Sequence, residues 1–449
     1  MNPILPSFSH ARALLVLGLP LVGSHLAQML LHVSDTVIMG WYGVPELAAV
    51  ALGSSFFFVT FVLGAGFAQA VMPMVAQAVG RGEETEVRRA ARMGLWLSIL
   101  FGAVSYPLFW WSEPLLLVLD QPSEVAELCG DFLRIAGLGM IPALLVMTLK
   151  SYLGALERTQ VVLWVTVAAV FLNTPLCFAL VFGYWGAPEM GVRGAGLASM
   201  LAQVLTMLLL ALYAAWLPAL RHFRLFQRFW RPDRHALKQV FRLGWPIGFT
   251  GLAESGLFQA TALMMGWIGT VQLAAHAIAM QVTALGFMLH LGLSNATTIR
   301  TGRFAGAGDW ENLKRGGKVA VALSTAIALL QIAIYLIWPE AIIGLFIDPN
   351  GVRAAEILQF GSILLAMAAA FQLVDAGQVM ALGLLRGVQD TRVPMWLAAA
   401  SYWGVGMPTA YIFAFPLGFG GIGLWTGLVI GLTLAAGSLM ARFWLRVPR

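Results

Sequence analysis

The chain has few charged residues and almost no cysteine. Asp, Glu, Lys and Arg make up only 11% of its 449 residues, whereas about 25% is usual in soluble globular proteins. Together with a hydrophobic share of 59%, this shortage excludes a water-soluble fold. Cys129 and Cys177 are too few for a disulfide scaffold or a multi-cysteine metal site. A Walker A loop, an HExxH motif and a nucleic-acid-binding module are also missing, which argues against ATP drive, zinc hydrolysis and nucleic acid as a partner.

Long apolar stretches fill most of the chain, and its mean hydropathy is +0.82. A transmembrane helix needs about 20 apolar residues, so we predict an all-α polytopic membrane protein. The first apolar stretch continues as far as Asp35, so we expect a first transmembrane helix there and not a cleaved signal peptide. The twelve expected spans lie near residues 14–42, 47–78, 92–112, 131–152, 161–183, 192–217, 241–267, 273–300, 318–338, 357–381, 393–415 and 422–443.

Basic residues separate strongly between alternate loops of this arrangement. Of the 27 Lys and Arg residues, 24 fall on one side, and only Arg134, Arg193 and Arg353 fall on the other. Positively charged loops remain in the cytoplasm, so we expect both termini to be cytoplasmic. The longest polar connector, residues 218–240, alternates arginine with aromatic residues. It suits a surface of anionic lipid as well as a linker between two halves of the protein.

An internal repeat divides the chain. Residues 17–83 match residues 243–309 at 20 of 67 positions without a gap, and a second register, at offset 232, places Thr159 over Thr391. We therefore predict an N-lobe of six helices (1–217), a basic linker (218–240) and a C-lobe of six helices (241–449). A pseudo-twofold axis along the membrane normal would relate the lobes and place a substrate cavity between them, as in transporters.

Three acidic residues lie inside expected spans: Asp35, Glu254 and Asp375. Each carboxylate would cost about 2.5–3.5 kcal/mol at the bilayer centre. We expect no Lys or Arg at a similar depth, so ion pairs cannot offset this cost. The acids must then face water, bind a cation or carry a proton, and each of these states suits a cation-driven transporter.

Polar neighbours accompany the acids at helical spacing. His25, Gln28 and His32 lie in one stripe with Asp35, and similar faces hold Thr250 and Thr261 with Glu254, and Gln372 and Gln378 with Asp375. The alternative is that these groups only join helices, at about 0.6 kcal/mol for each contact. Pro20 and Pro246 interrupt the first and seventh spans at matching points and are hinge candidates, or static packing kinks.

At these residues the sequence resembles the MATE family of multidrug and toxic compound extrusion proteins, in its NorM-like bacterial branch. The resemblance covers nearly the whole chain. It implies two six-helix bundles in a V and the export of lipophilic, often cationic drugs in exchange for sodium ions or protons. The segments that carry it are VSDTVIMGWYG around Asp35, AESGLF around Glu254, QLVDAGQV around Asp375, AAHAIAMQ from residue 274, LNTP from 172 and GAPEMGVRGAG from 186.

The resemblance also implies roles for individual residues. Asp35 would be the essential N-lobe carboxylate, with Asn173 as its partner and Pro20 at the bend. Glu254 and Asp375 would form the C-lobe cation site, and would be metal ligands only if sodium is the coupling ion. This chain has Cys177 where some relatives have an acid, and Phe287 and Phe371 where some have tyrosines, which favours protons over sodium as the coupling ion.

The function expected from the sequence is therefore secondary active drug efflux by a protein that is not an enzyme and needs no cofactor. We expect it to work as a monomer in the bacterial inner membrane, on small drugs or organic cations. The alternatives are a lipid-linked precursor flippase, which would need a more cationic cavity, an intramembrane enzyme and a channel. The substrate-binding candidates are Gln28, His32, Asp35, Glu254, Phe258, Phe287, Met288, Phe371, Asp375 and Tyr402.

Overall fold

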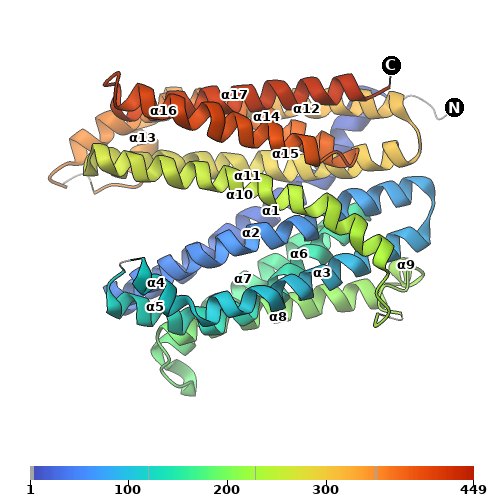
Figure 1. The fold of residues 1–449 in the computed structure, drawn as a ribbon, viewed down its shortest axis with the longest axis horizontal. Helices are drawn as coiled ribbons and strands as arrows, with labels where there is room; N and C mark the ends of the chain where they lie inside the picture. The colour runs from blue at the N-terminus through green and yellow to red at the C-terminus, as the bar shows by residue number, and fades with distance from the viewer. Residues whose placement is uncertain (1–4, 120, 228, 349–350, 449) are drawn as a thin grey trace. The chain divides into compact units, whose positions relative to one another are not determined.

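The computed structural model describes residues 5–119, 121–227, 229–348 and 351–448. Helices account for its regular structure, and no strand occurs in these residues. The predicted all-α class is confirmed. The chain forms two compact units: the first is Gly23–Gly248, and the second joins Met1–Val22 to Phe249–Arg449. We call them the amino-terminal and the carboxy-terminal unit (Figure 1).

Two long helices belong to both units: α1 (Ser7–Tyr42) and α10 (Arg234–Ile268). The other helices of the amino-terminal unit are α2 (Val44–Arg81), α3 (Glu84–Trp110), α4 (Ser112–Val118), α5 (Ser123–Ala136), η1 (Gly137–Gly139), α6 (Met140–Ala155), α7 (Thr159–Phe182), η2 (Tyr184–Gly186), α8 (Val192–Trp216) and α9 (Pro218–Arg221). Those of the carboxy-terminal unit are α11 (Thr270–Gly306), α12 (Trp310–Ile337), α13 (Pro339–Gly344), α14 (Ala354–Gly387), α15 (Arg392–Ala399), η3 (Ala400–Gly406), α16 (Met407–Ala414) and α17 (Gly420–Arg446).

Ten helical segments are long and apolar enough to cross a membrane among the described residues. They are α1, α2, α3, the continuous pair α5 and α6, α7, α8, α11, α12, α14 and α17. The two remaining expected spans also form helices. One is α10, which carries Arg242 and Glu254, and the other runs through α15, η3 and α16.

The repeat is visible in how equivalent helices end. After α2, Gly82 has a φ of 74°, and after α11, Gly308 has a φ of 69°. The Gly82 amide donates to the Val79 carbonyl, and the Gly308 amide donates to the Ala305 carbonyl. This left-handed turn satisfies carbonyls at the end of a helix, and glycine adopts it without strain. Both halves therefore stop their second long helix in the same way.

The two units also exchange the first parts of α1 and α10 at equivalent positions. The chain changes unit after Val22 and again after Gly248, and these two residues coincide in the repeat at offset 226. Pro20 and Pro246 each lie two residues earlier. Each half thus begins with a helical segment that packs in the opposite unit.

Glycines let the exchanged segments approach their neighbours. A Cβ on Gly66 of α2 would collide with the backbone of Gly244 and Gly248 in α10. The equivalent Gly292 of α11 has the Val22 amide nitrogen 2.6 Å from the place of such a Cβ. Side chains cannot fit at these distances, because the obstructing atoms belong to the backbone.

Replacing Gly66 by Ala should therefore destabilise the amino-terminal unit. Overpacking of this kind costs about 1–3 kcal/mol, although Gly to Ala inside a helix normally stabilises by about 0.8–1 kcal/mol. The matched control is Gly437→Ala in α17, where a Cβ would meet nothing within 4 Å. Thermal unfolding in detergent should show a lower midpoint for Gly66→Ala only, and equal midpoints for the two variants would contradict the close approach.

The connector between the two halves is held against α3. The Arg92 Nε donates to the Leu225 carbonyl at 2.7 Å, and the Trp96 Nε1 donates to the Phe229 carbonyl at 2.8 Å. Because α10 begins at Arg234, the last part of the expected linker 218–240 is already helical. Side chains of α3 therefore order this connector by binding its backbone.

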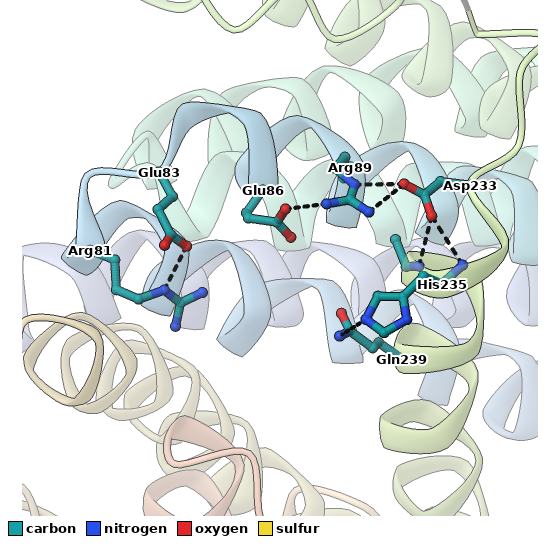
Figure 2. A network of polar contacts seen from close by, with 8 residues as sticks. Arg81, Glu83, Glu86, Arg89, Asp233, His235 and Gln239 are labelled. Atoms are coloured by element: carbon teal, nitrogen blue, oxygen red, sulfur yellow. Dashed lines mark hydrogen bonds and ion pairs between the residues drawn. The ribbon is translucent and has the colours of Figure 1, made fainter.

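Asp233 starts α10 and ties it to α3 (Figure 2). Its Oδ1 accepts from the amides of His235 and Ala236 at 3.0 and 3.1 Å, which is an N-cap, and its Oδ2 accepts from the Arg89 Nε at 2.6 Å. Arg89 also pairs with Glu86. Burial alone would raise the pKa of Asp233, but the Ala236 and His235 amides and the Arg89 guanidinium outweigh it, so that the pKa lies below its ordinary value.

This depressed pKa predicts the pH dependence of the junction. A carboxylate whose pKa is lowered by folding stabilises the fold above its ordinary pKa of 3.8 and loses that contribution as the pH falls through the folded-state pKa. Asp233→Asn keeps a good cap and should cost less than about 1 kcal/mol, whereas Asp233→Ala should cost about 1–2 kcal/mol. Thermal unfolding at pH 7 and at pH 3.5 measures both effects, and an Asp233→Ala midpoint equal to that of the unsubstituted protein would contradict the cap.

Candidate functional site

Asp35 lies on α1 inside the amino-terminal unit, where two other helices meet its carboxylate. The Asn173 Nδ2 of α7 donates to Asp35 Oδ1 at 2.8 Å, and the Ser199 Oγ of α8 donates to Oδ2 at 3.3 Å. The thiol of Cys177 lies against the same carboxylate. All three partners are neutral, so they orient the carboxylate without cancelling its charge.

Asn173 is fully buried, and its own Oδ1 has no hydrogen-bond partner among the described residues. Cys177 is one turn further along α7 and is also fully buried. The structure thus brings together Asp35 and Asn173, the pair that the family resemblance implies. The sequence did not predict Ser199, because this residue is far from Asp35 in sequence and nothing in the pattern of α8 marks it.

Glu254 and Asp375 come together in the carboxy-terminal unit, on α10 and α14. The Gln378 Nε2 donates to Glu254 Oε1 at 3.3 Å, and the charges of Glu254 and Asp375 act on each other. Asp375 is only 1% exposed, and within the described residues neither of its carboxylate oxygens has a hydrogen-bond partner. A buried carboxylate without donors is costly unless it is protonated or binds a cation.

Further buried polar atoms surround this acid pair. Gln372 and Gln378 lie on the same face of α14 as Asp375, and both are fully buried. Both amide atoms of Gln372 and the Oε1 of Gln378 lack partners among the described residues. Buried polar atoms are nearly always satisfied in proteins, so such a group of exceptions marks a place for a ligand, an ion or water.

Tyr402 adds a phenol oxygen to the acid pair. It is fully buried, its hydroxyl has no partner among the described residues, and the charges of Glu254 and Asp375 act on it. It lies in η3, a π-helical segment that interrupts the expected continuous span 393–415. Segments of this kind often occur at functional sites because they change the direction of side chains.

Aromatic side chains extend from the same region. The rings of Phe258 and Phe371 meet edge to face at 5.9 Å, and Phe371 meets Trp425 at 5.7 Å. The indole of Trp425 donates to His276 Nδ1 at 3.1 Å. Phe371 and Trp425 are buried in the core of this unit, whereas Phe258 is partly exposed and can contact a ligand without repacking.

The other predicted residues are more dispersed. Gln28, Phe287 and Met288 are half-buried, and His32 is exposed on α1. The stripe on α1 therefore presents Gln28 and Asp35 in more protected positions than His32.

Two basic side chains reach the polar faces of these helices from the helix ends. The charge of Arg386, near the end of α14, acts on Glu254. Lys150 of α6 places its Nζ 3.4 Å from Ser24 Oγ, half-way along α1. The hydropathy pattern assigned both to helix ends, but a long side chain carries its charge several ångströms from its backbone.

The architecture and the carboxylates inside the helices together define a class of protein: a multi-pass helical membrane protein with an acidic site in each of two repeated units. A family model described as MatE matches residues 20–179 and again residues 246–412. The two matches begin at Pro20 and Pro246, which are equivalent in the repeat. The chain belongs to the MatE family, as its resemblance predicted.

Relatives of known name agree with this assignment. Over 442 residues the chain is 45% identical to the "Probable multidrug resistance protein NorM" of Agrobacterium fabrum, covering 98% of this chain and 95% of the relative. The protein of the same name from Rhizobium meliloti is 45% identical over 436 residues, which are 97% of this chain and 93% of that one.

Solved structures confirm the two-lobe fold. The eukaryotic MATE transporter AtDTX14 superposes with a TM-score of 0.87 at 19% identity, covering 98% of this chain and 97% of that one. A MATE protein in complex with MaL6 gives a TM-score of 0.88 at 22% identity, covering 98% and 96%.

Proposed function

We propose that this protein is a secondary active multidrug efflux transporter, which exports lipophilic and cationic compounds in exchange for protons or sodium ions. The observation that carries the proposal is the pair of acidic sites, one in each unit, built around Asp35 and around Glu254 with Asp375. The multidrug resistance names of the relatives support the same function. We also propose that the protein has no enzymatic activity and needs no cofactor.

Coupling in this proposal is competition for the carboxylates. A cationic compound and the driving ion both prefer a carboxylate, so binding of one weakens binding of the other. A coupling free energy of 1–3 kcal/mol changes affinity by about 5- to 150-fold. The neutral partners of Asp35, namely Asn173 and Ser199, suit this exchange because no fixed positive charge competes with the passenger.

The substrate would contact Gln28, His32 and Asp35 in the N-lobe, and Glu254, Phe258, Phe287, Met288, Phe371, Asp375 and Tyr402 in the C-lobe. Aromatic faces and methionine suit flat cations of varied shape.

Pro20 and Pro246 are proposed as hinges. Each lies two residues before the position where its helix passes from one unit to the other. A proline frees one backbone carbonyl and weakens a helix locally, so bending there would change the relation of the units with little change inside either one.

We propose a monomer in the bacterial inner membrane, with both termini and the basic connector in the cytoplasm. The functional division is an N-lobe (1–217), a linker (218–240) and a C-lobe (241–449).

The test is transport by purified protein in liposomes. Efflux of a fluorescent organic cation should follow an imposed pH gradient alone or an imposed sodium gradient alone, and should show counterflow with unlabelled substrate. Counterflow of the substrate, together with no response of efflux to the pH gradient or to the sodium gradient, would contradict ion coupling. Movement of a lipid-linked pyrophosphate without movement of the cation would favour the flippase.

Tyr402 should distinguish the two ions. Its phenol oxygen can join the carboxylates of Glu254 and Asp375 as a hard ligand for sodium, whereas protonation of a carboxylate does not need it. If sodium drives transport, Tyr402→Phe should raise the sodium concentration for half-maximal rate by about tenfold. This is the loss of affinity expected when one polar contact to a charged group is removed. If protons drive it, the pH dependence should be unchanged. Tyr411→Phe on α16, which is exposed, is the matched control.

A further inference from the structure

Lys150 is a positive charge inside the amino-terminal unit for which the coupling scheme above gives no role. Its Nζ lies 3.4 Å from Ser24 Oγ, longer than a good hydrogen bond. An ammonium has three donors, and no carboxylate forms an ion pair with Lys150 in the part of the chain that the structure describes. Its side chain is half-buried.

Other polar groups surround this ammonium. Ser24 and Thr166 share a hydrogen bond of 3.0 Å between α1 and α7, and the charge of Lys150 acts on His25. Hydroxyls and an imidazole can complete the binding of an anion, but they cannot neutralise a lysine. An intramembrane lysine costs about 2.5–3.5 kcal/mol without a partner, so its presence needs a reason.

The repeat shows that the fold itself does not require this lysine. In the register with offset 232, Lys150 corresponds to Leu382, which is buried in the carboxy-terminal unit. The structure supports this register, because the equivalent residues Glu157 and Gln389 have φ values of 61° and 58°. An apolar side chain therefore serves at the same place in the other half.

The position of Lys150 relative to Asp35 indicates what the lysine recognises. Ser24 and Asp35 are eleven residues apart on α1, which is about three turns and 16 Å, so that they share one face of the helix. Gln28 lies between them on that face. This face of α1 thus has the Lys150 ammonium of α6 beside one end, an amide in the middle and a carboxylate at the other end.

We propose that Lys150, with Ser24, His25 and Thr166, forms a carboxylate-recognition site in the amino-terminal unit. It binds the acidic group of an amphoteric substrate whose amine binds Asp35. Allowing about 3 Å for the contact at each end, the substrate has its two charges about 10–13 Å apart. This inference rests on the proposed efflux function and adds a specificity residue to it.

The experiment compares an amphoteric aromatic compound, with its amine and carboxylate about 10–13 Å apart, with its methyl ester, which is a monocation of nearly the same shape. Transport of each by the protein in liposomes gives the ratio of the ester KM to the acid KM. Lys150→Met removes the charge and keeps the length of the side chain, Lys150→Arg keeps the charge, and Lys238→Met is the control at an exposed lysine of the same unit.

The expected result is that Lys150→Met lowers this ratio about tenfold or more, the usual effect of losing a hydrogen bond to a charged group. The KM for the acid should rise, while the KM for the ester should stay equal or fall because a repulsion is removed. Lys150→Arg and Lys238→Met should keep the ratio of the unsubstituted protein. Equal changes for both compounds, or no change for either, would overturn the inference.

Transport of the ester by Lys150→Met is the internal check that this variant is folded. If Lys150→Met fails that check, Lys150→Gln takes its place in the comparison. Equal KM values for acid and ester in the unsubstituted protein would overturn the inference by themselves. An unsubstituted protein that moves the ester without preferring the acid leaves the efflux function standing. One that moves neither compound refutes the efflux function itself.

Discussion

Replacing Asp35 by Asn is expected to abolish efflux while the protein remains folded. Asn has the same shape and can keep one hydrogen bond to Asn173 and one to Ser199, so the packing of α1, α7 and α8 should persist. What disappears is the negative charge for which substrate and driving ion compete. Without that competition the gradient has nothing to act on at this site, and drug resistance of cells should fall to the level without the protein.

The measurement is dye efflux from liposomes together with thermal unfolding of the purified variant. Glu124→Gln is the matched control, because this carboxylate at the start of α5 is exposed and lies in the same unit. It should leave both readouts unchanged. Full efflux by Asp35→Asn, with a normal unfolding midpoint, would remove Asp35 from the mechanism.

Neutralising the acid pair of the carboxy-terminal unit should be almost as severe. Glu254→Gln and Asp375→Asn should each lower the transport rate by at least about tenfold, because the two charges act on each other and, in the proposed scheme, bind one driving ion together. If they form one site, the double variant should be little worse than the more damaging single variant, since coupled residues are not additive. If the losses of transport rate in the two single variants multiply in the double variant, Glu254 and Asp375 belong to two separate sites.

Asp375→Asn should lower the transport rate without lowering the stability of the protein. The carboxylate is buried, and both of its oxygens are without partners in the described chain, so an uncharged amide is cheaper to bury by up to about 3 kcal/mol. The thermal midpoint should stay the same or rise while transport falls. Such a trade between stability and activity is typical of functional sites. The control is Glu340→Gln, an exposed carboxylate on α13 of the same unit, which should affect neither quantity.

Much of the fold followed from local properties of the sequence. Hydropathy depends only on residue type, so it locates the spans. It does not locate the ends of the helices, because helices continue beyond the apolar core of a membrane. The same argument selected Asp35, Glu254 and Asp375, since the cost of an acid in a membrane does not depend on knowing its neighbours.

The residue pattern thus predicted the class of the protein, its duplication and the three acids inside its helices. Helix packing decided which groups lie near one another: Ser199 beside Asp35, Tyr402 where the charges of Glu254 and Asp375 act on it, and Lys150 at the level of Ser24. It also decided that the chain passes between units after Val22 and Gly248. These features depend on which helices pack together and on where the ends of long side chains lie. The periodicity of a single helix encodes neither the helix pairing nor the side-chain positions.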